Sequence, residues 1–94
     1  MPPDLTEVAR DAANTVFGRP LVEAAHLGDM IGSDGDAVRR VRLILKDDAI
    51  EQLDGETLLD ANLAISRALQ EAGEPLRILV EYAEQRELDE LGIH

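Results

Sequence analysis

The chain has 94 residues, with 20 Asp and Glu against 9 Lys and Arg, so its formal charge at pH 7 is −11. This length suits one domain and leaves no room for separate catalytic and regulatory domains, and a content of 45% hydrophobic and 31% charged residues excludes a wholly disordered chain. The absence of cysteine excludes disulfides and thiolate zinc sites, and the strong negative charge argues against direct binding to nucleic-acid phosphates.

The first predicted element is an amphipathic helix that begins after Asp4. Asp4 and Glu7 have the spacing of a capping box, and apolar residues recur at helical intervals from Leu5 to Phe17. Gly18 follows, and glycine is the residue type that most often ends a helix. The sequence therefore predicts a helix over residues 4–17.

A second helix is predicted for residues 20–31. Pro20 suits the first position of a helix, and the apolar residues after it continue to Ile31. Gly28 counts against this helix because glycine is a poor helix former. The N-terminal helical segment is thus expected to occupy residues 4–31, before a turn of Gly, Ser and Asp at residues 32–36.

The chain after this turn predicts a strand, a helix, a strand and a helix over residues 38–92. Residues 38–46 and 76–82 alternate between apolar and polar side chains, which is typical of strands with one covered face. Between them, Asp54 or Thr57 opens a helix that ends at the Gly and Pro of residues 73–75. A short acidic helix, residues 84–91, then finishes at Gly92.

These elements predict one small α+β domain over residues 1–94. It contains a strand-helix-strand unit in its C-terminal half and a short sheet with helices on one face. Two strands are too few for a stable sheet, so a third is expected from residues 14–22, from residues 49–53 or from another copy of the chain. The basic side of the first strand favours a two-layer arrangement, because sheets covered on both faces are apolar throughout.

Three carboxylates follow the first predicted strand and a fourth lies at the end of the second, and together they form a candidate ligand site. Open sheets bind ligands at the carboxyl ends of parallel strands, and carboxylates there could serve a site for magnesium, for phosphoryl transfer or for a cationic ligand. The chain has no glycine-rich phosphate loop, and the carboxylate at position 54 is also explained as a helix cap. The candidate residues are Asp47, Asp48, Asp54 and Glu81.

Two other motifs could in principle bind metal ions, but structural roles explain them better. Glu23 and His26 have the spacing of two metal ligands on one helix face, but a di-iron bundle needs two such motifs. Asp34 and Asp36 resemble the start of a calcium loop, yet the glycine and the final glutamate of that loop are missing. The sequence therefore predicts no metal, no cofactor and no catalytic residue.

The charge distribution indicates the residues that would meet a protein partner. Residues 47–94 carry 13 acids and 3 bases, whereas residues 1–46 carry 7 acids and 6 bases. The basic side chains of the first strand are expected to pair internally with the acidic C-terminal helix, and the alternative is an interface for carboxylates of a partner. The candidate partner-binding residues are Arg40, Arg42, Glu84, Glu87, Asp89 and Glu90.

The layout from Val38 onward resembles the STAS domains of anti-sigma-factor antagonists. It has a strand, an acidic turn, a helix that ends in Ala-Gly at residues 72–73, a strand, and a closing helix that ends in Leu-Gly-Ile at residues 91–93. The resemblance implies a regulatory domain with a phosphorylatable serine in an Asp-Ser-Ser-Gly turn. The corresponding residues 54–57 contain no serine, and Thr57 is the only hydroxyl on offer.

Together, these observations predict a non-enzymatic protein-binding, regulatory or accessory protein. Its acidic surface would attract a basic partner and speed encounter, and a homodimer or a hetero-complex is expected. The alternatives are a STAS-like regulatory domain, and a small ligand-binding or metal-binding protein or enzyme that uses the carboxylates at the strand ends. Residues 1–7 have no basic region or apolar run and no apolar stretch could span a bilayer, so a cytoplasmic protein without membrane contact is expected.

Overall fold

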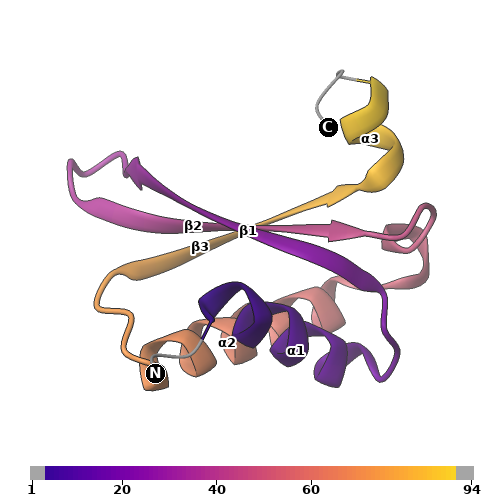
Figure 1. Cartoon of the computed structure of the whole chain (residues 1–94), viewed down its shortest axis with the longest axis horizontal. Coiled ribbons are helices and arrows are strands. Elements are labelled where there is room, and N and C mark those ends of the chain that lie inside the picture. The colour runs from indigo at the N-terminus through magenta and orange to yellow at the C-terminus, as the bar shows by residue number, and fades with distance from the viewer. Residues whose placement is uncertain (1–3, 91–94) are drawn as a thin grey trace.

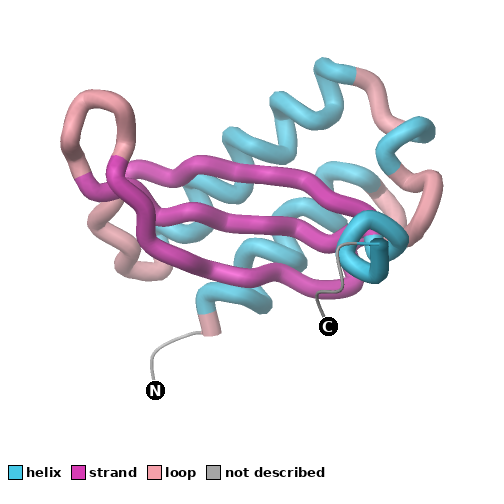
Figure 2. Tube along the Cα trace, turned by 90° about the horizontal axis from the view of Figure 1, so that it is seen from above, coloured by secondary structure: helices cyan, strands magenta, loops and turns pink. Residues whose placement is uncertain are grey.

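The computed structural model describes residues 4–90 and shows two long helices beneath a twisted three-stranded sheet (Figure 1). The two helices lie side by side and cover one face of the sheet, while a third, short helix stands at one end on the opposite side (Figures 1 and 2). The predicted α+β architecture is confirmed. In chain order the elements are α1 (Leu5–Phe17), β1 (Val22–Ile31), β2 (Ala37–Leu45), a 3-10 helix (Ile50–Gln52), α2 (Gly55–Glu71), β3 (Arg77–Glu84) and α3 (Gln85–Glu90).

The sheet is mixed, and β2 is its central strand. The strand order is β1-β2-β3, with β1 antiparallel to β2 and β2 parallel to β3. A tight turn joins β1 to β2, whereas α2 connects the parallel pair and forms the predicted strand-helix-strand unit. As a result the carboxyl ends of β2 and β3 lie together at the end of the sheet opposite the β1–β2 turn.

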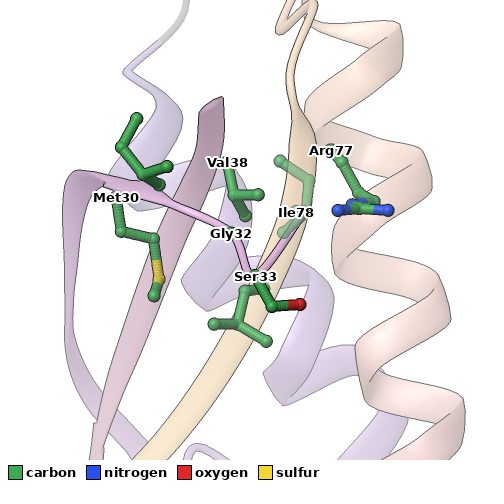
Figure 3. Close-up of a pocket in the computed structure, with 8 residues that line it drawn as sticks. Met30, Gly32, Ser33, Val38, Arg77 and Ile78 are labelled. Atoms are coloured by element: carbon green, nitrogen blue, oxygen red, sulfur yellow. The ribbon is translucent and has the colours of Figure 1, made fainter. Parts of the chain in front are cut away.

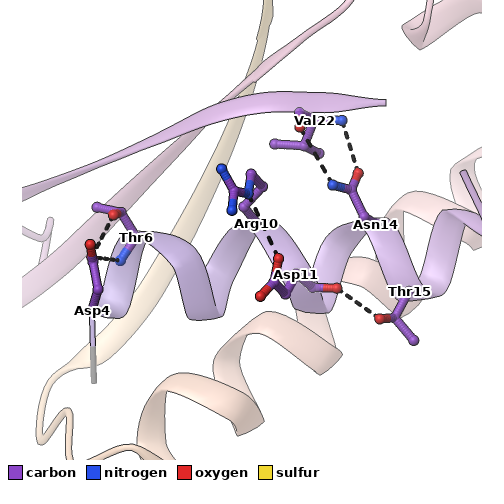
Figure 4. A network of polar contacts seen from close by, with 7 residues as sticks. All are labelled: Asp4, Thr6, Arg10, Asp11, Asn14, Thr15 and Val22. Carbon is purple, nitrogen blue, oxygen red and sulfur yellow. Dashed lines mark hydrogen bonds and ion pairs between the residues drawn. The ribbon is translucent and has the colours of Figure 1, made fainter. Parts of the chain in front are cut away.

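The caps of the two long helices agree with the sequence. Asp4 accepts a hydrogen bond from the backbone N–H of Thr6 at the start of α1 (Figure 4), and Gly18 ends that helix with a left-handed φ of 71°. Asp54 accepts a hydrogen bond from the N–H of Thr57 at the start of α2. Side chains that accept from orphan N–H groups stabilise a helix start by about 1 kcal/mol, which explains where both helices begin.

The prediction of a helix over residues 20–31 is wrong, because Val22–Ile31 forms β1. The register with β2 slips at Glu23, so Val22 opposes Leu45 while Ala24 opposes Ile44. This extra residue places Val22 on the same side of the sheet as Ala25, three positions later. The bulge therefore gives the strand an apolar spacing that imitates a helix. The third strand of the sheet is therefore β1, whereas residues 14–22, residues 49–53 or another copy of the chain were expected to supply it.

The core lies between β2 and the two long helices. Val41, Leu43 and Leu45 are fully buried and all face the helix layer. They pack with small residues of α1, such as Ala9, and with Ile65 of α2. Alanines at the contact let a helix approach the sheet closely, and burial of each large aliphatic side chain contributes about 1.5–3 kcal/mol.

Asn14 holds the start of β1 against α1 (Figure 4). Its Oδ1 accepts a hydrogen bond from the backbone N–H of Val22 at 2.9 Å, and its Nδ2 donates to the carbonyl oxygen of the same residue at 3.4 Å. Both backbone groups of a buried residue are thereby satisfied by one side chain. This contact fixes the position at which the chain leaves the first helix and enters the sheet.

We expect Asn14→Ala to lower the free energy of unfolding by about 1–3 kcal/mol, because it leaves the backbone groups of buried Val22 without partners. Urea denaturation of the full chain measures this difference. Thr15→Ala is the matched control, since the Thr15 hydroxyl bonds only the exposed Asp11 carbonyl and its loss is expected to change stability by less than about 0.5 kcal/mol. Equal effects of the two substitutions would contradict the assigned role of Asn14.

Candidate functional site

Exposed carboxylates gather where β2 ends and α2 begins. The chain from residue 47 to residue 60 contains no Lys or Arg, and each of its six acidic residues is exposed. Only Lys46, directly before it in sequence, and Arg86, by contact, bring positive charge to this segment in the described part of the chain. We call this group the acidic end; it consists of Asp47, Asp48, Glu51, Asp54, Glu56 and Asp60.

Arg86 joins α3 to the acidic end. Its backbone N–H donates to Asp47 Oδ1 at 2.7 Å, and its guanidinium lies 3.5 Å from Asp48 Oδ1 and 3.0 Å from Glu84 Oε1. The other oxygen of Glu84, a buried side chain, accepts from the backbone N–H of Ile50 at 3.2 Å. The charges of Asp48 and then Glu84 raise the pKa of Arg86. These contacts tie the end of β3 to the connection between β2 and α2.

The structure brings together only part of the predicted ligand site. Asp47 and Asp48 meet through Arg86, whereas Asp54 caps α2, where the hydrogen bonds from Thr57 lower its pKa. Glu81 lies three residues before the end of β3, and its carboxylate contacts guanidinium groups of β2 instead. Among residues 4–90, no cluster of three or more His, Asp or Glu side chains could hold a metal ion.

The predicted partner-binding residues also lie in two separate places, on the face of the sheet and around α3. Arg42 and Arg40 pair with Glu81 of β3, with nitrogen–oxygen distances of 3.4 Å and 3.8 Å. Internal pairing was expected, but with the C-terminal helix. Glu87 is exposed on α3, while Glu84 is the buried last residue of β3. Asp89 and Glu90 belong to α3 by their backbone; their side chains, and Gly92, lie outside the described part of the structure.

Arg39 makes the most buried ion pair, and the sequence did not indicate it. Its Nε donates to Glu74 Oε1 at 2.6 Å, and its terminal nitrogen pairs with Asp29 of β1. The Glu74 side chain is only 5% exposed, and its hydrogen bond is the main cause that raises the pKa of Arg39. Position 39 follows the alternation of Val41 and Leu43, so parity alone could have placed this arginine on the covered side of the sheet.

Tyr82 and Asn62 link β3 to α2. The Tyr82 hydroxyl donates to Asn62 Oδ1 at 2.6 Å and lies 3.3 Å from the carbonyl oxygen of Leu58. Burial of the ring raises the pKa of Tyr82 to about 12. Asn62, a polar residue on the side of α2 that faces the sheet, therefore has a structural partner in β3.

The remaining sequence motifs have structural or exposed positions. His26 is exposed on β1. Asp34 accepts from the backbone N–H of Asp36 and from Arg77, each at 3.2 Å, which lowers its pKa and closes the β1–β2 turn. The aspartates of this turn thus serve the backbone, as short polar side chains commonly do.

Comparisons with protein-family models, with curated proteins and with solved structures give no match for this chain. The resemblance of its layout to STAS domains receives no support from them. No helix in residues 4–90 is long and apolar enough to cross a membrane.

We expect the ionisation of the single tyrosine, followed by its ultraviolet absorbance, to have its midpoint near pH 12 in the folded protein rather than near 10. Because the fold raises this pKa, the protonated hydroxyl stabilises the fold below pH 10, and that contribution is lost as the pH rises toward 12. The stability difference between the wild type and Tyr82→Phe should therefore shrink over this range. A midpoint near 10 in folded protein would contradict the burial of the hydroxyl.

Proposed function

We propose that this protein is a non-enzymatic binding module that engages a basic protein partner through its acidic end. The observation that carries the proposal is the concentration of six exposed carboxylates between residues 47 and 60, on the connection that Arg86 contacts and on the start of α2. One-signed surfaces of this kind raise association rates by about 10–10³-fold, and the effect weakens with salt. A regulatory or accessory subunit is the corresponding role.

A hetero-complex fits these charges better than a homodimer built on the same surface. Two copies each carry a formal charge of −11, so contact between their acidic ends would bring like charges together. A basic partner instead would neutralise carboxylates that Lys46 and Arg86 leave in excess. The acidic end is therefore proposed to face a different protein.

The alternative of carboxylate catalysis has less support. General acid-base chemistry needs groups that share one shielded site with their substrate, and the carboxylates of the acidic end are exposed. Glu81 is engaged by two arginines at another place on the sheet. The STAS-like alternative needs a phosphorylatable hydroxyl in the turn before α2, whereas Thr57 lies within the first turn of α2 and its backbone N–H donates to the Asp54 cap.

The proposal is tested by the capture of partner proteins on the immobilised full chain at low salt. The bound proteins are then eluted with salt and identified. We expect a stoichiometric basic partner whose association with the acidic-end variant Glu51→Gln/Glu56→Gln/Asp60→Asn slows about tenfold or more. This variant leaves Asp47, Asp48 and the Asp54 cap intact.

The matched control is Glu7→Gln/Asp11→Asn/Glu23→Gln, which removes the same number of exposed charges from α1 and β1. It is expected to retain the partner with a nearly unchanged association rate. Equal losses in the two variants would show that net charge alone is responsible. A partner that is not basic, or no partner at all, would overturn the proposal.

A further inference from the structure

The outer edge of β3 is open in the part of the chain that the structure describes. In the strand order β1-β2-β3, only the side of β3 that faces β2 is paired. An unpaired edge presents a row of backbone N–H and C=O groups that can bond to another strand. β3 runs for eight residues in an unbroken register and contains no proline, so its edge is suited to such pairing.

β1 has the other open edge of the sheet, but its residues disfavour pairing between two copies. Its register with β2 slips at Glu23, and a bulge twists an edge strand away from regular pairing. Glu23 and Asp29 are exposed, and the strand contains no Lys or Arg to oppose them. Two copies of β1 would therefore bring like charges together, which destabilises a strand pair.

The side chains of β3 on the face away from the two long helices form a self-complementary row. Leu79, which is 42% exposed, lies beside Arg40 of β2, and Arg77 and Glu81 share its face because side chains alternate along a strand. At the start of β3, beside a hollow of about 410 Å³, the Arg77 side chain lies on the side of the strand away from Val38 of β2 (Figure 3). When two β3 strands run antiparallel with Leu79 opposite Leu79, Arg77 of each copy stands opposite Glu81 of the other.

The charges select this register over its neighbours. A shift of the centre to Ile78 or Val80 opposes Leu79 to a charged residue, and a shift to Glu81 places two carboxylates opposite each other. Both charged groups also have partners within their own chain. The pairs between copies therefore specify the register, while the apolar contact at the centre and the backbone hydrogen bonds hold the strands together.

An exposed apolar surface on α2 lies below the same edge. Leu59 and Leu63 are one helical turn apart and are 58% and 61% exposed. Asn62 turns toward Tyr82 of β3, and at about 100° per residue both leucines lie on one side of it while the buried Ala61 lies on the other. Because α1 packs along α2, the buried side faces α1 and the leucines face outward (Figure 2).

We propose that the chain forms a homodimer in which two β3 strands pair antiparallel over residues 77–81, about a twofold axis at Leu79. This axis stands perpendicular to the sheet, so the two sheets join into one and both helix layers lie on the same side. The exposed leucines of the two α2 helices then face each other across the axis. One association thereby covers both apolar surfaces that border the edge of β3.

The antiparallel arrangement also keeps the acidic ends of the two copies apart. The acidic end lies at the carboxyl end of β3, and the two carboxyl ends point away from the axis in opposite directions. Five residues at about 3.3 Å each separate Leu79 from Glu84, so the two strand ends lie about 33 Å apart. This is about four Debye lengths at physiological salt, so two chains of charge −11 can associate here and leave both acidic ends free.

The first test is the mass of the full chain in solution, measured by sedimentation over a concentration series. We expect a species with twice the mass of one chain. Leu79→Asp places two carboxylates opposite each other at the axis, and Arg77→Glu opposes two carboxylates on either side of it. Each substitution should raise the dissociation constant of the dimer about tenfold or more, and Leu63→Asp should raise it as well.

The matched control is Ile31→Asp, because Ile31 is 67% exposed on β1, at the far edge of the sheet from β3. This variant is expected to keep the dissociation constant of the wild type. Thermal unfolding verifies that each variant is folded. Arg77, with a side chain that is 66% exposed, keeps the test valid if position 79 does not tolerate Asp.

The second test determines the register by oxidation of single-cysteine variants of a chain that has no cysteine of its own. Directly opposite residues of an antiparallel pair have Cα atoms about 4.5–5.5 Å apart, which a disulfide can span. Leu79→Cys should therefore form a covalent dimer rapidly on mild oxidation, as seen on a non-reducing gel. Ile31→Cys, equally free of other thiols, should not.

The proposal is overturned if the chain remains a monomer up to about 1 mM, in which case the edge is left for a strand of another protein. It is also overturned if a dimer survives both Leu79→Asp and Arg77→Glu, or if Leu79→Cys is oxidised to a dimer no faster than Ile31→Cys. The acidic-end variant Glu51→Gln/Glu56→Gln/Asp60→Asn is expected to dimerise like the wild type. The dimer and the binding function of the acidic end can therefore fail separately.

Discussion

The central strand β2 sets the arrangement of the molecule, because it is paired on both sides and the two long helices cover one of its faces. Val41, Leu43 and Leu45 are fully buried on the covered face. A slip of one residue would turn these three side chains outward, so the register is fixed by their burial. The residues between them, Arg40 and Arg42, must then leave on the opposite face. The distribution of positive charge follows from the packing of the core.

The same constraint explains the most buried ion pair. Arg39 has the parity of the core residues, so its side chain is directed to the covered side of the sheet, and Glu74 meets it there with a nearly buried carboxylate. Asp29, directly opposite in β1, supplies a second acceptor. Buried charges cost several kcal/mol in lost hydration unless hydrogen bonds satisfy them, so the nearly buried carboxylate of Glu74 requires this arginine. One side chain thus couples β1, β2 and the entry to β3.

Local signals predicted most of the fold, and they failed where geometry depends on pairing. Asp4 and Asp54 identify the starts of the two long helices in the sequence, because a helix cap acts within one turn of the backbone. The bulge at Glu23 is different, since it exists only in relation to β2 and erased the alternation that would have identified β1. The prediction that Glu81 lies at the end of its strand was wrong for a similar reason. The predicted strand stopped at Tyr82, but pairing with β2 extends it to Glu84, which leaves Glu81 short of the strand end.

The parallel pairing of β2 and β3 also sets the distance between the β1–β2 turn and the acidic end. With eight residues at about 3.3 Å each, β3 spans about 26 Å between them. That length is roughly three Debye lengths at physiological salt, where the screening distance is about 8 Å. The field of the acidic end is therefore strongly screened at the β1–β2 turn, where Asp34 pairs with Arg77. A strand of ordinary length is enough to make the charges at the two ends of the sheet electrostatically independent.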